Sequence, residues 1–264
     1  MGKIFVIMSG KGGVGKSTIS AALAEYYAGL GLQVALLDGD VGLRCADLML
    51  NMQDRVVYDL GDVTDDRCGL DRALIVHPRY PSLSLLAAPQ MLKPSDVKAK
   101  KMKKIIESLA ERMDIVLLDA PAGIGRGLKN LLGVQAETFV VATPDDVSIR
   151  DAERLSSLLF ERGEIRPGLI LNRVNEKLIR RGEMMPPHQI SAVLDMPLMG
   201  ILPESSEIYR ALLRHETALH AADKKVKKAV EGIALRLLGE ARPLESYASH
   251  GIRGLFHRGG GARI

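Results

Sequence analysis

The sequence predicts a doubly wound α/β fold, in which helices cover both faces of a mostly parallel sheet. Short apolar runs alternate along the chain with longer stretches of helical periodicity. Most of the apolar runs lack polar alternation, which is typical of parallel strands covered on both faces. The 264 residues are 47% hydrophobic and 26% charged, a composition typical of globular proteins, so a sizeable core can form.

The alternating elements can be placed in order along the chain. Seven strands are expected, at Ile4–Met8, Gln33–Leu37, Leu83–Ala87, Ile115–Leu118, Thr138–Ala142, Leu169–Leu171 and Leu198–Leu202. Six helices are expected between and after them, at Lys16–Ala28, Ser95–Arg112, Ser148–Arg162, His188–Leu194, Glu204–Leu213 and Lys224–Leu238. This order predicts one domain over residues 1–241 and a flexible tail over residues 242–264.

The mild basic character of the chain belongs largely to that tail. The whole chain carries a net charge of +4, of which residues 242–264, with four arginines against one glutamate, carry +3. A second basic run, residues 93–104, holds six lysines against Asp96. Apolar residues recur within and after this run at helical spacing, which predicts the solvated face of an amphipathic helix; a nucleic-acid or partner surface is the alternative.

Several classes of protein are disfavoured by what the sequence contains. Cys45 and Cys68 are the only cysteines, which are too few for a disulfide framework and wrongly spaced for a CxxC metal or redox motif. The six histidines show no metal-ligand spacing, and no apolar run reaches the roughly 18 residues of a membrane span. The N-terminus enters a strand pattern without a signal-peptide layout, so a reducing cytoplasm is the expected compartment.

A glycine-rich loop is the strongest chemical signal in the sequence. It joins the first expected strand to the first expected helix and consists of Gly10, Lys11, Gly12, Gly13, Val14, Gly15, Lys16, Ser17 and Thr18. Glycines allow backbone N–H groups to surround a phosphate, and the helix N-terminus adds partial positive charge. Lys16 can then reach the β and γ phosphates while the Ser17 hydroxyl ligates Mg²⁺.

The second lysine of this loop carries a family resemblance. GKGGVGKST, with Lys11, resembles the deviant Walker A motif of the MinD/ParA superfamily of ATPases. The resemblance implies ATP or ADP and Mg²⁺ as ligands, with Lys11 reaching across a nucleotide-sandwich dimer to the partner's phosphates. In that case Lys11 acts with Lys16 in catalysis, and ATP-dependent dimerisation is coupled to hydrolysis. The alternative for Lys11 is a solvated loop lysine.

Acidic residues follow two of the expected strands, at the edge where α/β sheets place their ligands. By resemblance Asp40 orients or deprotonates the attacking water, and Asp38 supports the Mg²⁺ shell. Asp119 follows an apolar strand as a Walker B carboxylate does; it is expected to hold Mg²⁺ through water, with the Gly123 backbone sensing the γ-phosphate. The alternative for a single Asp in this position is a helix cap.

Base recognition is expected from two later loops at the same edge. Asn172 ends one strand, and Pro203 with Glu204 ends the last one. Both positions match adenine contacts of the superfamily, an Asn amide at the base edge and backbone near the Pro at the exocyclic amine. Turn chemistry is the alternative for each.

Within the superfamily the chain resembles the MinD group, ATPases that help to place the bacterial division septum. The resemblance rests on four blocks in order: Asp38–Asp47, Val56–Asp59, Asp119–Ile124 and Ser148–Arg154. It implies a MinC-like division inhibitor and a MinE-like or other spatial regulator as partners. Gly125 departs from the group, whose members often carry Glu after the AGI triplet.

The tail carries a short basic amphipathic segment. Ile252, Leu255 and Phe256 stand at i, i+3 and i+4, and Arg253 and Arg258 lie elsewhere on the helical wheel. Such a segment suits an anionic membrane surface. One tail should bind weakly, because burying each apolar side chain contributes roughly 1.5–3 kcal/mol before the cost of ordering. Two tails in an ATP-bound dimer would gain by effective concentration. A disordered tail or a strip packed on the domain is the alternative.

These observations predict a cytoplasmic ATPase that sits peripherally on the inner face of the membrane, hydrolyses ATP to ADP and phosphate, and helps to position the division septum. No specific nucleic-acid partner is expected. The alternatives are a ParA-like or flagellar-number ATPase acting on DNA or other cargo, and a metabolic amide ligase of the same fold. Iron–sulfur carriers are disfavoured because the sequence lacks a suitable cysteine pair.

Overall fold

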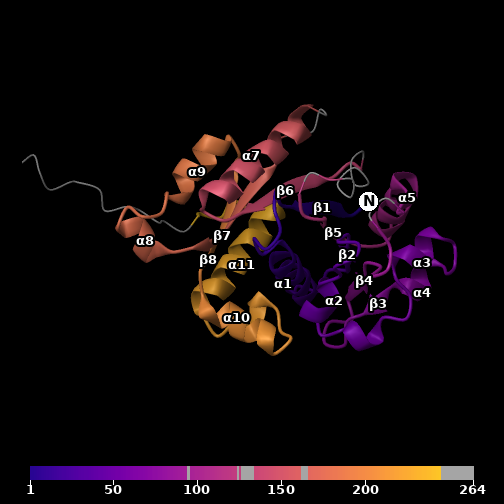
Figure 1. The fold of residues 1–264 in the computed structure, drawn as a ribbon. Coiled ribbons are helices and arrows are strands. Elements are labelled where there is room, and N and C mark those ends of the chain that lie inside the picture. The colour runs from indigo at the N-terminus through magenta and orange to yellow at the C-terminus, as the bar shows by residue number, and fades with distance from the viewer. Residues whose placement is uncertain (94–95, 124, 126–133, 162–165, 245–264) are drawn as a thin grey trace, which may run out of the picture.

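The fold is a mostly parallel sheet flanked by helices, as predicted, but the sheet has eight strands where seven were expected, because the short strand Ile75–Val76 at its edge was not predicted. The structure is a computed structural model, and it describes residues 1–93, 96–123, 125, 134–161 and 166–244. The strand order is β3-β4-β2-β5-β1-β6-β7-β8, with all pairs parallel except β3 with β4 (Figure 1). The strands are β1 (Lys3–Met8), β2 (Val34–Asp38), β3 (Ile75–Val76), β4 (Leu83–Leu86), β5 (Ile115–Asp119), β6 (Glu137–Ala142), β7 (Gly168–Val174) and β8 (Leu198–Pro203).

Six longer helices match the expected ones. They are α1 (Lys16–Gly29), α5 (Ala99–Ala110), α7 (Asp146–Glu161), α9 (Pro187–Leu194), α10 (Ser206–Leu213) and α11 (Lys224–Leu237). The α5 prediction began too early, because Lys98 has extended backbone angles and precedes the first helical residue. The shorter elements were not predicted: α2 (Ala46–Met49), α3 (Leu60–Thr64), α4 (Leu70–Ala73), α8 (Glu176–Arg180), and the 3₁₀ turns η1 (Gln53–Arg55) and η2 (Ala218–His220).

Each face of the sheet carries its own apolar core, which explains the absence of polar alternation in the strands. Val6 and Met8 of β1 pack in the core beneath α5, α7 and α9, whereas Phe5 and Ile7 pack in the core beneath α1 and α11. Figure 1 shows α1 and α11 side by side. The Tyr27 hydroxyl donates a 2.9 Å hydrogen bond to the Ala234 carbonyl, so the helix after the glycine-rich loop is tied to the last helix.

The register of the parallel strands gathers the acidic residues at one edge. Asp38 at the end of β2 pairs in register with Asp119 at the end of β5. The central strand β1 lies between β5 and β6, so the glycine-rich loop that follows it emerges beside both carboxylates. The sheet therefore brings Lys16 of this loop to Asp119, 103 positions away in sequence, as open α/β sheets do at the carboxyl ends of their strands.

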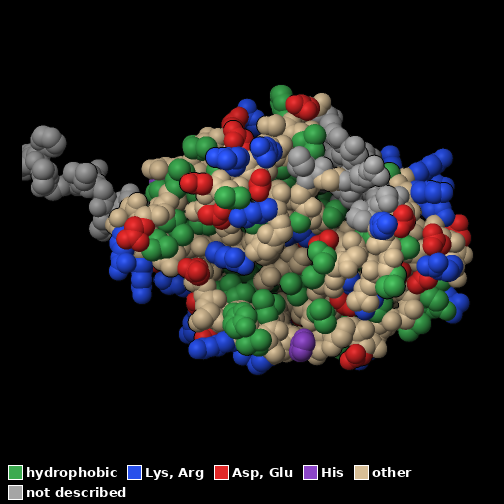
Figure 2. Space-filling view, viewed as in Figure 1, with side chains coloured by type: hydrophobic (Ala, Val, Ile, Leu, Met, Phe, Trp, Pro, Cys, Tyr) green, Lys and Arg blue, Asp and Glu red, His purple; other side chains and the backbone are tan. Residues whose placement is uncertain are grey.

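The lysine-rich run forms the solvated face of α5, as the helical spacing predicted. Met102, Ile106 and Leu109 are buried on its inner side. Figure 2 shows Lys and Arg side chains gathered over α5. Two of the lysines have acidic partners, since Lys101 pairs with Asp66 at 2.7 Å and Lys103 lies 3.7 Å from Glu107.

Over the part of the chain that the structure describes, no helix has both the length and the apolar character needed to cross a membrane. The helix α11 ends at Leu237, and the structure follows the chain to residue 244. The predicted domain boundary at residue 241 stays a prediction.

The contact between β8 and α11 makes a stability prediction. A Cβ at Gly200 would lie 2.1 Å from Ile233 Cγ1, so Gly200→Ala forces the helix and the strand apart. We expect the free energy of unfolding to fall by about 1–3 kcal/mol in urea denaturation, the usual cost of overpacking. Gly69→Ala is the control, because a Cβ there meets no atom within 4 Å; its effect should stay within about 0.5 kcal/mol. Equal effects of the two substitutions would contradict the close approach.

Candidate nucleotide-binding site

The glycine-rich loop turns between β1 and α1 in a shape that requires glycine. Gly13 and Gly15 have φ angles of 79° and 92°, in the left-handed region that side chains with a Cβ rarely adopt. A Cβ on Gly15 would also lie 2.1 Å from the Asn172 amide nitrogen. A Cβ on Gly12 or Gly13, by contrast, would meet no described atom within 4 Å. Asn172 thus packs against the loop at Gly15, whereas no described atom covers the loop at Gly12 and Gly13.

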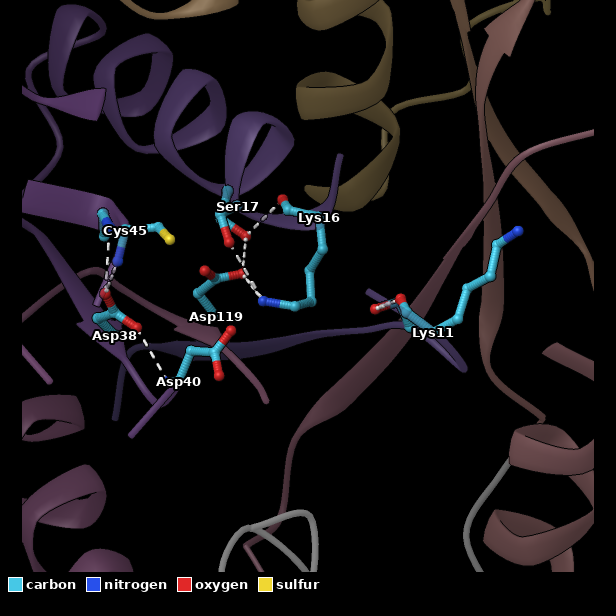
Figure 3. Close-up of polar contacts among 10 residues, drawn as sticks. Lys11, Lys16, Ser17, Asp38, Asp40, Cys45 and Asp119 are labelled. Carbon is cyan, nitrogen blue, oxygen red and sulfur yellow. Dashed lines mark hydrogen bonds and ion pairs between the residues drawn. The ribbon is translucent and has the colours of Figure 1, made fainter. Parts of the chain in front are cut away.

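A buried ion pair lies directly behind this loop. Lys16 Nζ donates to Asp119 Oδ1 at 2.7 Å, and the two side chains are only 5% and 1% exposed (Figure 3). Lys16 Nζ also lies 3.3 Å from the Ser17 hydroxyl, and the Ser20 hydroxyl donates to Asp119 Oδ1 at 3.0 Å. Thr18 is buried in the first turn of α1.

The second oxygen of Asp119 is the feature of this site that a cation would satisfy. Asp119 Oδ2 is buried and has no hydrogen-bond partner among the described residues. A buried carboxylate oxygen without a donor is costly, and Mg²⁺ or its water is the kind of ligand that would satisfy it. The Ser17 hydroxyl follows Lys16 at the same helix N-terminus, so Ser17 and Asp119 fit a magnesium site.

Asp38 holds the loop that carries Asp40. Its Oδ1 accepts the N–H of Asp40 at 2.9 Å, and its Oδ2 accepts the N–H groups of Cys45 and Ala46 at 3.0 Å each. Burial raises the pKa of Asp38 to about 7, and the neighbouring Asp119 carboxylate adds to the effect. Asp38 therefore fixes the loop and the start of α2, and its contribution to a magnesium shell stays a prediction.

Asp40 points toward Lys16 and Asp119 (Figure 3). It is partly exposed, and burial raises the pKa of its carboxyl group, while the positive charge of Lys16 acts in the opposite direction. A carboxylate so placed, beside the loop but outside the ion pair, can contact a ligand bound in front of Lys16. Its position is compatible with the water-orienting role that the resemblance implies.

Lys11 points away from Lys16 (Figure 3) and contacts Asp145, the residue before α7. Its Nζ donates to Asp145 Oδ1 at 3.0 Å, with the two side chains 31% and 49% exposed. The same Asp145 oxygen accepts the Ser148 N–H at 2.9 Å, so Asp145 also satisfies a backbone donor in the first turn of α7. Within one chain, the ammonium group of Lys11 is thus directed away from the site that Lys16 occupies.

Gly123 lies beside the loop, as expected. It has a φ angle of 83°, and a Cβ there would lie 3.7 Å from the Gly10 carbonyl oxygen. Its N–H donates to the Ser9 carbonyl at 2.8 Å. The Gly123 backbone is therefore attached to the start of the loop, and sensing of a γ-phosphate by this group stays a prediction. Gly125 is exposed.

Asn172 and Glu204, which are both expected to contact the adenine base, have different partners in the structure. Asn172 is buried, and its side-chain nitrogen donates to the Val14 carbonyl at 2.7 Å, so it holds the loop itself. Pro203 is buried at the end of β8. Glu204 follows it and accepts from the Asn175 side chain at 2.8 Å. The structure thus brings Asn172 to the phosphate loop, while Glu204 pairs outside it.

Three residues of the site were missed in the sequence. Ser20 follows Lys16 by four residues and shares its helix face, which is a signal that could have revealed it. Asp145 and Arg173 are 134 and 160 residues from their loop partners, Lys11 and Gly13, and no local pattern marks them. Arg173 has a φ angle of 57°, and its guanidinium donates to the Gly13 carbonyl at 2.9 Å.

The expected membrane contacts Ile252, Arg253, Leu255, Phe256 and Arg258 lie outside the described residues.

The fold and this site define a nucleotide-binding protein with a phosphate loop on a doubly wound α/β sheet. The chain belongs to the CobQ/CobB/MinD/ParA nucleotide-binding domain family, whose model matches residues 5–218. It is 36% identical over 252 residues to the septum site-determining protein MinD of Synechocystis, covering 95% of each chain.

Solved structures agree with this assignment. A chain of the MinC:MinD cell division protein complex of Aquifex aeolicus has a TM-score of 0.85 and 33% identity, with 93% of this chain and 99% of that chain covered. MinD of Pyrococcus horikoshii, solved with Mg-ADP, has a TM-score of 0.80 and 27% identity, with 90% and 96% covered. The predicted fold and family resemblance are both confirmed.

The contact of Asn172 with the loop leads to a prediction about nucleotide selectivity. Asn172→Ala removes the hydrogen bond to Val14, so we expect weaker binding of ATP and GTP by the same factor, roughly fivefold for a hydrogen bond of about 1 kcal/mol. Calorimetric titration of both nucleotides measures the two affinities. A loss confined to ATP would show instead that Asn172 reads the adenine edge.

Proposed function

We propose that this chain is a Mg²⁺-dependent ATPase that dimerises on ATP, binds the cytoplasmic face of the membrane through its tail, and helps to position the division septum. The observation that carries the proposal is the arrangement of the two loop lysines. Lys16 lies buried at the phosphate loop, and Lys11 points outward to Asp145. A site with one inward and one outward lysine suits a reaction that needs a second subunit.

Lys16 and Asp119 prepare the site for a phosphate. Without a nucleotide, the buried charge of Lys16 needs a partner, and Asp119 provides it at 2.7 Å. The phosphates of ATP would take over Lys16 and release Asp119 Oδ1, while Asp119 Oδ2 already lacks a donor among the described residues. When bound, Mg²⁺ would neutralise charge on the phosphates, with Ser17 and Asp119 as the residues that hold it.

Asp40 would orient the attacking water. Its loop is fixed through Asp38, which accepts N–H groups on both sides of the turn, so the Asp40 carboxylate is positioned before substrate arrives. Lys16 would stabilise the charge that develops on the transferred phosphoryl group. The reaction is the hydrolysis of ATP to ADP and phosphate.

Lys11 would complete the site of a second copy of the chain. Its ion pair with Asp145 is largely exposed, and such pairs contribute only about 0.2–1 kcal/mol. The lysine can therefore leave Asp145 at little cost when the phosphates of a partner offer a stronger counter-charge. Hydrolysis that requires Lys11 would then occur only in the dimer.

The tail and the relatives support the cellular role. The segment with Ile252, Leu255 and Phe256 combines an apolar stripe with arginines, which suits a peripheral contact with anionic lipid. The Synechocystis relative is a septum site-determining protein, and the Aquifex relative was solved in a MinC:MinD complex. We infer a MinC-like inhibitor and a MinE-like or other spatial regulator as partners of this chain.

Sedimentation with anionic liposomes tests the membrane part of the proposal. We expect the intact chain to sediment with ATP roughly tenfold more than with ADP or without nucleotide, because two tails in one dimer act together. A chain that ends at Leu244 should stay in the supernatant under all three conditions.

Two tail variants of equal charge sharpen this experiment. Phe256→Glu breaks the apolar stripe, whereas Ala262→Glu adds the same charge outside it. We expect the first variant to stay in solution and the second to sediment with ATP. Binding that ignores the nucleotide, or that survives removal of the tail, would overturn the membrane proposal.

Lys11 and Asp145 make a prediction about dimerisation. Lys11→Ala should abolish the ATP-dependent dimer in sedimentation velocity. Asp145→Asn removes the charge that holds Lys11 but keeps an oxygen for the Ser148 N–H, so it should strengthen the dimer by up to about fivefold per copy of the pair. Asp145→Ala is the comparison variant that also loses the contact with α7. A monomeric Lys11→Ala protein with undiminished ATP turnover would contradict the role of Lys11 in the partner's site.

A further inference from the structure

A cysteine lies beside the predicted magnesium position. The Cys45 N–H donates to Asp38 Oδ2 at 3.0 Å, which fixes the backbone of this residue at the start of α2. Its side chain is partly exposed, and Figure 3 shows the sulfur directed toward Ser17. Neither the predicted hydrolysis nor the fold uses this thiol.

A second observation indicates that the space next to this sulfur can take a ligand. Asp119 Oδ2 is buried and has no hydrogen-bond partner among the described residues, and in Figure 3 the unpaired oxygen of Asp119 lies on the side that Cys45 faces. Ser17 borders the same space. The Cys45 thiol therefore lies beside Asp119 Oδ2 and the Ser17 hydroxyl. Together the three groups line the space in which a cation and a phosphate would fit.

We propose that Cys45 is a thiol-modification site inside the nucleotide site, and that a mixed disulfide at Cys45 and a bound Mg-nucleotide exclude each other. The inference rests on the proposed function, because that function places the magnesium ion at Ser17 and Asp119. The reagent class is a low-molecular-weight disulfide. Its adduct would occupy the space in front of Ser17 and would turn off every step that depends on ATP.

The chemistry is an ordinary thiol–disulfide exchange. The Cys45 sulfur, as its thiolate, attacks one sulfur of the reagent, a new S–S bond forms, and the S–S bond of the reagent breaks. The other half of the reagent leaves as a thiolate and takes up the proton that Cys45 lost. Cys45 is oxidised to the disulfide level and the departing half of the reagent is reduced to a thiol, so no other oxidant is needed. A reducing thiol reverses the step.

The charges around Cys45 determine which disulfides react. Burial raises the pKa of the Cys45 thiol, and the negative charges of Asp38, Asp40 and Asp119 raise it further, so labelling is carried out at alkaline pH, where the thiolate forms. Lys16 is the cation among these carboxylates and is already paired with Asp119. Arg44 is nearby in sequence and is neutralised by Asp47 at 2.6 Å. The net charge is negative, so a cationic disulfide should reach Cys45 faster than an anionic one, roughly tenfold or more for a focused potential.

The other cysteine is an internal control. Cys68 is also partly exposed. It follows α3, and its backbone N–H donates a 3.4 Å hydrogen bond to the Asp62 carbonyl oxygen. It packs against the core that includes α5, on a different segment from the phosphate loop. The rate at which Cys68 reacts with a disulfide should therefore be the same with and without nucleotide.

The test uses the full chain, with cystamine as the cationic disulfide and dithiodipropionate as the anionic one. Peptide mass spectrometry follows the labelling of Cys45 and Cys68 separately, with and without Mg-ADP. At a nucleotide concentration about 100 times its Kd, the free site falls to about 1%, so Cys45 labelling should slow on the order of 100-fold while Cys68 labelling is unchanged. Cystamine should label Cys45 faster than dithiodipropionate does.

The reciprocal measurement uses binding of a fluorescent ADP analogue. Cystamine treatment should abolish binding to the Cys68→Ala protein, and a reducing thiol should restore it. Cys45→Ser should make binding insensitive to cystamine. If the reduced chain binds Mg-ADP but labelling of Cys45 proceeds at the same rate with nucleotide, the inference is wrong and the proposed function stands. A reduced chain that fails to bind Mg-nucleotide would overturn both.

Discussion

The ion pair between Lys16 and Asp119 is the interaction on which the site depends. It joins the first residue of α1 to the last residue of β5, and both side chains are almost fully buried. Removing one partner of such a pair costs about 3–5 kcal/mol, because the other charge is left without compensation in a poorly solvated place. The ion pair therefore stabilises the phosphate loop until the phosphates of a nucleotide replace Asp119 as the partner of Lys16. Without such a replacement, breaking the pair is costly.

The sheet makes this contact possible. Parallel register sets Asp38 beside Asp119 and places β1 next to β5, so the loop after β1 emerges beside two carboxylates. The two carboxylates then take different roles. Asp38 accepts three backbone N–H groups and fixes the following turn, whereas Asp119 retains one unpaired oxygen among the described residues. The two aspartates therefore differ in their hydrogen bonding, although they are the same residue type at the ends of neighbouring strands.

The sequence was sufficient for the strands, the long helices and the phosphate loop because their signals are local. Strand β3, with two residues, and α2, with four, are too short for a hydrophobic period to repeat, so no periodic signal marks them in the sequence. The partner of Lys11 could not be predicted, because Asp145 lies 134 residues away and meets the loop only through the pairing of β6 with β1. The same holds for Arg173. The sequence therefore named residues that the structure gathers at one edge of the sheet, such as Lys16 and Asp119, but not the distant partners Asp145 and Arg173.

The two lysine contacts differ in strength by enough to order the proposed events. Breaking the buried Lys16–Asp119 pair without a replacement costs several kcal/mol, whereas breaking the exposed Lys11–Asp145 pair costs about 0.2–1 kcal/mol. Lys16 can thus leave Asp119 only for a phosphate that is already bound. Lys11 can leave Asp145 readily, but its charge gains nothing until the phosphates of a second chain come within reach. In the proposed dimer, nucleotide binding would therefore come before the exchange of lysines between subunits, and dimerisation through Lys11 would report that ATP is bound.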